Sequence, residues 1–204
     1  AKRFKGQEKL FVVGSAWQED LEILIPFINE NKLKFIVALH EIHESQLQHF
    51  QRSLTVKSIF YSQAEGRNPE DFNVLIIDNV GLLSRLYRYG EFAFIGGGFG
   101  KGLHNILEAA CYGVPVLFGD KNYEKFQEAT DLINRGGAFP VADYPDLKHK
   151  YEILNTPETF LLACEVCRQY VEENTGATGK IMEYCRGVLK ASAEGQSPHV
   201  RNSL

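Results

Sequence analysis

Short apolar runs alternate with longer amphipathic runs along this chain, and the alternation predicts strands separated by helices. We expect strands at residues 9–15, 34–39, 58–61, 74–78, 92–95, 115–118 and 138–141. We expect helices at residues 17–29, 42–52, 82–89, 103–111, 123–135, 157–172 and 178–190. Residues 193–204 lack such a pattern and are predicted to be frayed.

The predicted strands are continuously apolar, which is typical of a parallel sheet that helices cover on both faces. The sequence therefore predicts an α/β fold with a Rossmann-like parallel sheet. No repeat or low-complexity linker interrupts it, so residues 1–204 are interpreted as a single domain. Sheets of this kind bind ligands in the crevice beyond the carboxyl ends of their strands, and the candidate residues below lie at those ends.

The bulk composition excludes several functional classes. The net charge is −4, which disfavours nucleic acid as a partner because no broad cationic field would recruit it. No apolar run approaches the roughly 20 residues that are needed to span a bilayer. The chain opens on a short basic segment that leads directly into a strand, so we expect it to be part of a longer protein.

The four cysteines are predicted to be ordinary thiols. Cys164 and Cys167 have the C-x-x-C spacing, but both lie inside a predicted helix and no second pair of Cys or His follows to complete four ligands. We therefore predict packing thiols, no metal site and a reducing compartment.

The segment most informative about chemistry is a glycine-rich loop between a predicted strand and a predicted helix. Five of the seven residues from Gly96 to Gly102 are glycine, among them Gly97, Gly98 and Gly100. Glycine lets a ligand approach the main chain closely, and the free amides at the start of the following helix suit a phosphate. Lys101 adds a cation. The spacing matches neither a Walker A loop nor a convincing dinucleotide-binding G-x-G-x-x-G.

Three polar residues follow this loop. Asn105 and Glu108 are three positions apart, which predicts that they share a face of the expected helix. A carboxylate one turn into the helix can accept hydrogen bonds from both hydroxyls of a ribose. His104 and Glu108 are four positions apart and could pair with each other instead, and His104 could also be a capping residue. Glu108 could also be an acid on a solvated face.

The run from Gly96 to Pro115 resembles the loop-and-helix signature of the 3-deoxy-D-manno-octulosonic acid (Kdo) transferases. The shared features are the glycine loop, His104-Asn105, Leu107-Glu108 and Gly113-Val-Pro-Val. Residues 12–20, Val-Val-Gly-Ser-Ala-Trp-Gln-Glu-Asp, and residues 74–87, from Val-Leu-Ile-Ile-Asp to Leu-Tyr, resemble two further family segments. The resemblance covers about residues 9–140 and implies the C-terminal domain of a GT-B glycosyltransferase.

The resemblance implies a role for each candidate. Gly14 and Ser15 would lie near the donor phosphate, and the loop with Asn105 would hold the phosphate and the Kdo. Glu108 would bind the ribose hydroxyls. Asp78 through Gly81 would shape the nucleotide pocket, although Asp78 could instead cap the next helix. His40 and His43 occupy the place of a basic, His-containing stretch of the family, with a different spacing that leaves their roles open.

The same resemblance implies an inverting transferase that moves Kdo from CMP-Kdo to a lipid A precursor, without a metal or other cofactor. The donor would bind this chain, and the acceptor would bind an N-terminal domain that also supplies the catalytic carboxylate. We find no convincing general base, so the chain alone is predicted to bind nucleotide without transferring sugar. The full-length protein is expected at the cytoplasmic face of the inner membrane, peripheral to it or anchored.

Three alternatives stay open at this point. Another GT-B enzyme that uses a UDP-sugar would share the glycine loop and Glu108. A free-standing nucleotide-binding module would need the same loop but no second domain. A Rossmann oxidoreductase is disfavoured, because the first strand ends in Gly14-Ser-Ala-Trp and lacks a dinucleotide-binding loop.

Overall fold

A computed structural model of the chain describes residues 1–193. The predicted fraying of residues 193–204 concerns a segment that, from residue 194 on, lies outside the described residues. The described chain divides into two compact units, residues 1–170 and a second unit that begins at Val171, and each is described by itself.

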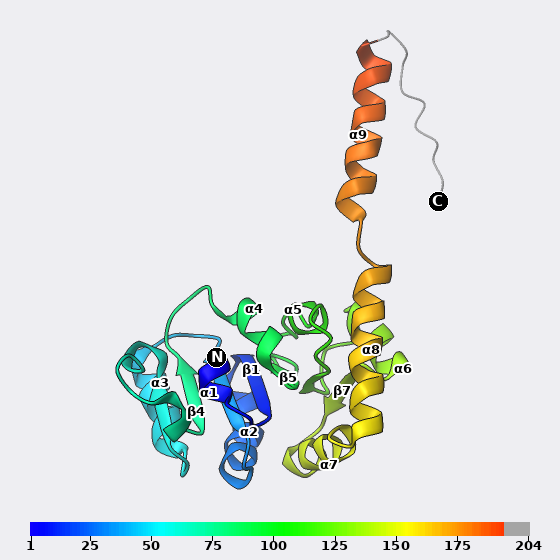
Figure 1. Cartoon of the computed structure of the whole chain (residues 1–204). Helices are drawn as coiled ribbons and strands as arrows, with labels where there is room; N and C mark the ends of the chain where they lie inside the picture. Colours follow the sequence, from blue (N-terminus) through cyan, green and yellow to red (C-terminus); the bar gives the residue numbers. More distant parts are fainter. Residues whose placement is uncertain (194–204) are drawn as a thin grey trace. The chain divides into compact units, whose positions relative to one another are not determined.

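The first unit contains a seven-stranded, wholly parallel sheet in the order β3-β4-β2-β1-β5-β6-β7 (Figure 1). The strands are β1 (Leu10–Ala16), β2 (Lys34–Leu39), β3 (Ser58–Phe60), β4 (Val74–Ile77), β5 (Phe92–Ile95), β6 (Val116–Gly119) and β7 (Ala138–Val141). This confirms the predicted parallel α/β sheet and every predicted strand. The order reverses direction between β1 and β5, and such a switch point opens a crevice at the carboxyl edge.

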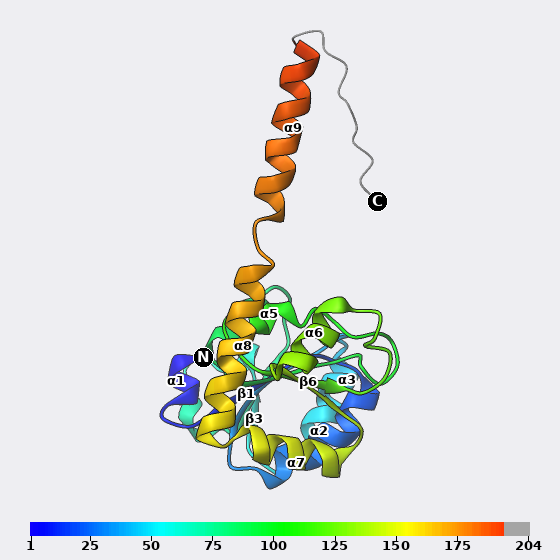
Figure 2. The ribbon, with the colours of Figure 1, turned by 90° about the vertical axis from the view of Figure 1, so that its right-hand side faces the viewer.

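Helices cover the sheet. They are α1 (Lys2–Lys5), α2 (Gln18–Glu30), α3 (Glu44–Ser53), α4 (Leu83–Leu86), α5 (Leu107–Ala110), α6 (Gln127–Arg135), α7 (Tyr144–Leu154) and α8 (Pro157–Glu173). Short 3-10 helices cover Tyr61–Gln63, Pro69–Asp71 and Tyr87–Tyr89. Figures 1 and 2 show α2 and α7 together on one side of the sheet and α5 on the opposite side.

The main core lies between the sheet and the helices α2, α3, α7 and α8. Phe11 of β1 is fully buried at its centre, and its ring lies 5.4 Å from that of Phe27, 5.7 Å from Phe35 and 6.1 Å from Phe92. Tilted aromatic pairs at such distances add to the stabilisation from burial. The core therefore fixes β1 and its neighbours rigidly, and this holds the loops at their carboxyl ends in place.

The structure corrects four details of the sequence interpretation. The helix expected from residue 103 begins only at Leu107, and the one expected from residue 123 begins at Gln127. The helix expected at residues 82–89 is α4 followed by a 3-10 turn. Helix α7 was not predicted, although the Asp143 side chain caps it by accepting a hydrogen bond from the Asp146 amide at 2.9 Å.

The second unit consists, in its described part, of the end of α8 and of α9 (Ala177–Ala193), which agrees with the last predicted helix. Several large apolar side chains of α9 are exposed: Ile181, Met182, Tyr184 and Leu189. Among the described residues, no helix is both long and apolar enough to cross a membrane.

Candidate ligand-binding crevice at the carboxyl edge of the sheet

The glycine loop leaves β5 at Gly96 and runs to Ile106 before α5 begins. Gly97 has φ +92° and Gly102 has φ +115°, so both adopt conformations that favour glycine. Asn105 accepts a hydrogen bond from the Leu107 amide at 3.0 Å and so supports the first turn of α5. Asn105 therefore precedes the helix, and the prediction that Asn105 and Glu108 lie on one helix is wrong.

Most glycines at the start of the loop are required by the protein's own packing. A Cβ on Gly96 would lie 2.2 Å from the Ser15 carbonyl oxygen, and one on Gly98 would lie 2.3 Å from that of Gly119. A Cβ on Gly97 would lie 2.2 Å from the Gly102 carbonyl oxygen. By contrast, a Cβ on Gly100 would find only the Glu19 carboxylate, at 3.6 Å. The loop is thus packed at its start and open at its tip.

Gly14 and Ser15 form an irregular end to β1 beneath this loop. The pairing of β1 with β2 shifts register between Val13 and Ala16, and Ser15 has φ +53°. A Cβ on Gly14 would lie 1.7 Å from the Tyr87 hydroxyl oxygen, so only glycine fits there. A non-glycine residue in the left-handed region carries backbone strain, and such strain is concentrated at functional sites.

Asp20 joins the glycine loop to the start of α2. Its Oδ2 accepts hydrogen bonds from the Trp17 amide at 2.8 Å and from the Gly97 amide at 2.9 Å. The side chain is fully buried, and Oδ1 has no hydrogen-bond partner. Burial raises the pKa of Asp20 to about 6, against the lowering effect of the two amides. The sequence interpretation noted this acidic position but assigned it no role.

A stack of rings lies beside the loop. Trp17 and His40 are stacked with their ring centroids 3.9 Å apart, and His40 and His104 are 4.6 Å apart. The Trp17 indole donates a hydrogen bond to Nε2 of His104 at 3.1 Å, and Lys101 Nζ lies 5.6 Å from the Trp17 ring centroid. Burial, and secondarily His40, lowers the pKa of His104. Residues that directly follow β1 and β2 therefore converge on the loop, and His104 contacts Trp17 rather than pairing with Glu108.

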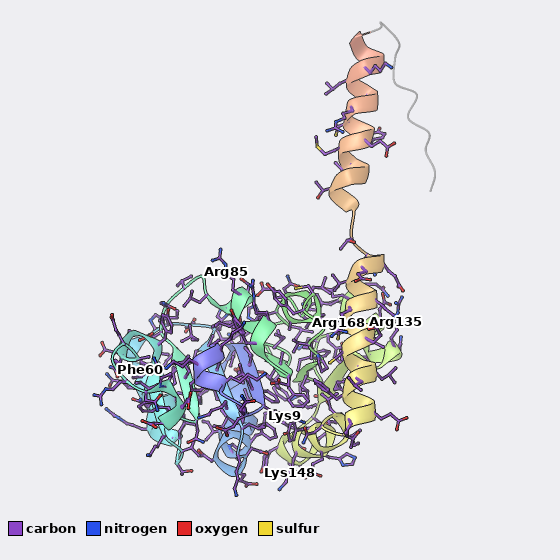
Figure 3. All side chains as sticks on the ribbon, in the orientation of Figure 1. Lys9, Phe60, Arg85, Arg135, Lys148 and Arg168 are labelled. Atoms are coloured by element: carbon purple, nitrogen blue, oxygen red, sulfur yellow. The ribbon has the colours of Figure 1, made fainter. Side chains whose placement is uncertain are left out.

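Glu108 lies in α5, half-buried, on the side of the crevice where Tyr87 packs against Gly14. Burial raises the pKa of Tyr87, and the negative charge of Glu108 adds to this effect. Gly113, with φ +70°, lies in the turn after α5, and a Cβ there would lie 2.6 Å from Nε of Arg168. Arg168 belongs to α8 and is labelled in Figure 3. The Arg168 side chain of α8 therefore leaves room only for glycine in the turn after α5.

The β4 end of the crevice is arranged differently from the prediction. Asp78 accepts hydrogen bonds from the Ser62 amide at 3.1 Å and from the Ser62 hydroxyl. It therefore supports the neighbouring loop, beside the edge-strand residue Phe60 (Figure 3). It does not cap α4, which has no side-chain cap.

The residues after Asp78 line an open cavity of about 270 Å³ together with His40. Its walls include Asn79, Val80 and Gly81, and the Val80 side chain is 89% exposed. Gly81 therefore lines this cavity, and its role in a nucleotide pocket stays a prediction. His43 is exposed in front of α3 and lies 3.8 Å from the Glu41 carboxylate.

The cysteines divide into two groups. Cys164 and Cys167 are buried in α8, and burial raises the pKa of Cys167 to about 12, so these are packing thiols as predicted. Cys111 and Cys185 are exposed, which corrects the expectation that all four are packed. Within residues 1–193, no group of three or more His, Cys, Asp or Glu side chains is arranged to hold a metal ion.

The structure thus brings together Gly14, Ser15, the glycine loop, Lys101 and His104, and it adds Trp17, Asp20 and Tyr87. The sequence did not reveal these three, because their partners lie more than 70 positions away in the chain. One signal was present: an acid three positions after Trp17 is the spacing of a helix capping box.

Comparison with known proteins shows which sequences and structures this chain resembles. No family model matches the chain. The 3-deoxy-D-manno-octulosonic acid transferase of Aquifex aeolicus is 27% identical over 198 residues, which is 92% of this chain and 52% of that protein. The enzyme of the same name from Rickettsia prowazekii is 25% identical over 174 residues, 81% of this chain and 38% of that protein. The chain thus spans about half, or less, of the length of these relatives.

A solved structure shows the same fold. The C-terminal CMP-Kdo binding domain of WaaA from Acinetobacter baumannii superposes with a TM-score of 0.72 at 19% identity, over 83% of this chain and 92% of that chain. The agreement extends over almost the whole of that domain. The chain is therefore a relative of the Kdo transferases and has the fold of the C-terminal domain of a GT-B glycosyltransferase.

Proposed function

We propose that this chain is the donor-binding part of an inverting glycosyltransferase that moves Kdo from CMP-Kdo to a lipid A precursor in lipopolysaccharide synthesis. The observation that carries the proposal is the glycine loop, which is packed against the ends of β1 and β6 at its start and exposed at its tip. The likeness to Kdo transferases along 92% of the chain supports the choice of donor.

Breaking the bond between Kdo and CMP leaves negative charge on the departing phosphate. In residues 1–193, the amide of Lys101 donates to no protein acceptor and the residue is exposed, so this amide is available to an anion. The Lys101 ammonium group forms no ion pair with the carboxylates of that part of the chain. Fixed donors of this kind stabilise a leaving group without reorganising. Because α5 has only four residues, its dipole contributes little, and we assign this role to the amide and the ammonium group of Lys101.

The cavity lined by His40 and residues 79–81 fits the base of the nucleotide, because it is mostly apolar and lies next to the loop across β1 and β2. Glu108 is proposed to hold the ribose hydroxyls between these two regions. Asn105, which supports the turn into α5, is assigned to the phosphate and Kdo side through the position that it gives the main chain.

Calorimetric titration of the chain with CMP, UMP and NADH tests this proposal. CMP should bind more tightly than UMP, and NADH should not bind. Glu108→Ala should weaken CMP binding by about tenfold or more, since it removes hydrogen bonds to a charged group. A preference for UMP would support a UDP-sugar enzyme instead. Unchanged CMP binding by the variant would contradict the role of Glu108.

The acceptor and the catalytic carboxylate are assigned to another domain of the full-length protein, which we propose to act at the cytoplasmic face of the inner membrane. The chain by itself should then bind CMP-Kdo without transferring Kdo. Incubation with CMP-Kdo and a lipid A precursor, followed by mass spectrometry of the lipid, checks this. A Kdo-bearing lipid in that reaction would show that the general base lies within this chain.

A further inference from the structure

Asp20 has an unusual environment for a carboxylate in the first turn of a helix. Its side chain is fully buried, and one of its two oxygens, Oδ2, accepts both available hydrogen bonds. The other oxygen, Oδ1, is buried without a partner. A buried carboxylate with one unpartnered oxygen is costly when ionised, so a position of this kind calls for a reason beyond capping.

The two hydrogen bonds connect different parts of the crevice. The Trp17 amide belongs to the start of α2, whereas the Gly97 amide belongs to the glycine loop 77 positions away from Asp20. A Cβ on Gly97 would also lie 3.3 Å from the His104 ring. Asp20 therefore fastens the loop at the point from which the main chain turns toward Lys101 and His104.

We propose that Asp20 is a positioning residue that fastens the glycine loop. When an anion binds at this loop, Asp20 takes up a proton on Oδ1. Oδ2 is occupied by two N–H donors, so Oδ1 is the oxygen that is free to carry a proton. A protonated Asp20 still accepts both bonds through Oδ2, and the loop stays fastened. Uptake of the proton removes the repulsion between a buried carboxylate and an arriving phosphate.

The charges around Asp20 fit this assignment. Glu19, on the same helix, is the ionisable neighbour that raises its pKa by charge, and burial has already brought that pKa to about 6. Lys101 and His104 of the loop and His40 after β2 all contact Trp17, three positions before Asp20. A phosphate added at the loop acts in the same direction as Glu19, so it raises the pKa of Asp20 further, toward neutral pH.

This inference rests on the proposed function, because CMP is the anion used to test it. The two informative variants are Asp20→Asn, which keeps an acceptor but has no charge, and Asp20→Ala, which has no acceptor. Glu152→Gln, an exposed acid of α7, serves as the matched control for loss of one negative charge. Thermal unfolding of each variant first establishes that it is folded.

The ratio of the dissociation constants of the wild-type chain and Asp20→Asn for CMP should depend on pH. At pH 8 the wild type should bind CMP about tenfold more weakly than Asp20→Asn does. This factor corresponds to the repulsion between two unit charges roughly 10 Å apart in a protein-like medium. At pH 5.5 the two should agree within about twofold, because Asp20 is then largely protonated in both states. The phosphate of CMP also loses a proton over this range in both proteins, and its added charge increases the repulsion in the wild type, where Asp20 is ionised at pH 8. Glu152→Gln should match the wild type throughout.

Hydrogen exchange of the Gly97 amide, measured by NMR without ligand, tests the fastening. Exchange should be slow in the wild type and in Asp20→Asn and at least about tenfold faster in Asp20→Ala, which leaves the amide without an acceptor. A ratio of CMP affinities that stays constant with pH overturns the proton uptake, and equal exchange in all three proteins overturns the fastening. If neither the wild type nor any variant binds CMP, the proposed function and the proton uptake both fail. Slow exchange in the wild type and Asp20→Asn but not in Asp20→Ala would still uphold the fastening.

Discussion

The two halves of the carboxyl edge are built in contrasting ways. At the β1–β5 half, Gly14, Gly96 and Gly98 leave no room for a Cβ because the main chain or a buried tyrosine lies against them. At the β2–β4 half, a Cβ on Gly81 would meet nothing within 4 Å, and Val80 is almost wholly exposed. The first half is fixed before a ligand arrives, whereas the second has room to adapt to one. Preorganisation is most valuable where charge develops, which agrees with the assignment of the phosphate to the first half.

The largest expected effect comes from disturbing the packed half. Gly96→Ala places a methyl group 2.2 Å from the Ser15 carbonyl and 2.7 Å from Ala16 Cα, and main-chain atoms cannot move aside easily. We expect a loss of about 3 kcal/mol in the free energy of unfolding, measured by urea denaturation. Gly187→Ala in α9, where a Cβ meets nothing within 4 Å, should not destabilise the protein. Similar values for the two variants would contradict the close packing that we assign to Gly96.

The next effect concerns pH. The folded-state pKa of Asp20 is raised to about 6 from 3.8, so this group favours the folded state most at low pH and the benefit is lost as the pH rises through 6. Between pH 5 and pH 7.5, the wild type should therefore lose about 1.4 kcal/mol of stability relative to Asp20→Asn. Denaturation curves at both pH values measure the difference. If the difference in stability between the two proteins does not change with pH, burial does not raise the pKa of Asp20.

A smaller effect is expected from Asp78→Ala. This change leaves the Ser62 amide without its acceptor on the outer side of β4, so it should cost about 1 kcal/mol of stability. CMP affinity should change less than twofold, since the carboxylate bonds to Ser62 rather than to the nucleotide pocket. Calorimetry of the variant checks this, and a loss of tenfold or more would restore Asp78 to the ligand site.

The smallest effect on stability is expected from Val80→Ala, because so exposed a side chain contributes little to the core. The free energy of unfolding should stay within about 0.5 kcal/mol of that of the wild type. CMP affinity should nevertheless fall about threefold, because the variant removes apolar area from the wall of the base cavity. Equal affinity for CMP would show that Val80 does not contact the base, and the base would then have to bind against other residues.

The sequence predicted the sheet better than the loops, for a physical reason. Continuous apolar strands leave a strong local pattern, so all seven were found. The start of α5 was misplaced because the periodicity of Leu103, Ile106 and Leu107 suggests a helix, whereas Gly102 at φ +115° and the Asn105 side chain delay it. Helix α7 was missed although Pro145 lies in its first turn, where a residue without an amide proton is tolerated.

The candidate site was predicted in composition but not in its internal connections. Glycine, lysine and the strand ends can be recognised from local sequence. The contact of Trp17 with His104, and that of Asp20 with Gly97, depend on how β1 and β5 are placed side by side. Local sequence contains no signal for such pairs, so their discovery required the three-dimensional fold.

The reversal of strand order between β1 and β5 also has an evolutionary consequence. The base cavity is built from chain before residue 90, and the glycine loop from chain after it, so each can accumulate substitutions with little effect on the other except where His40 stacks on His104 and Asp20 bonds to Gly97. A lineage could change its preferred nucleotide through substitutions before residue 90 while the glycine loop keeps its contacts with the phosphate. Chimaeras joined at Gly90 between related enzymes would be a natural way to transplant donor preference.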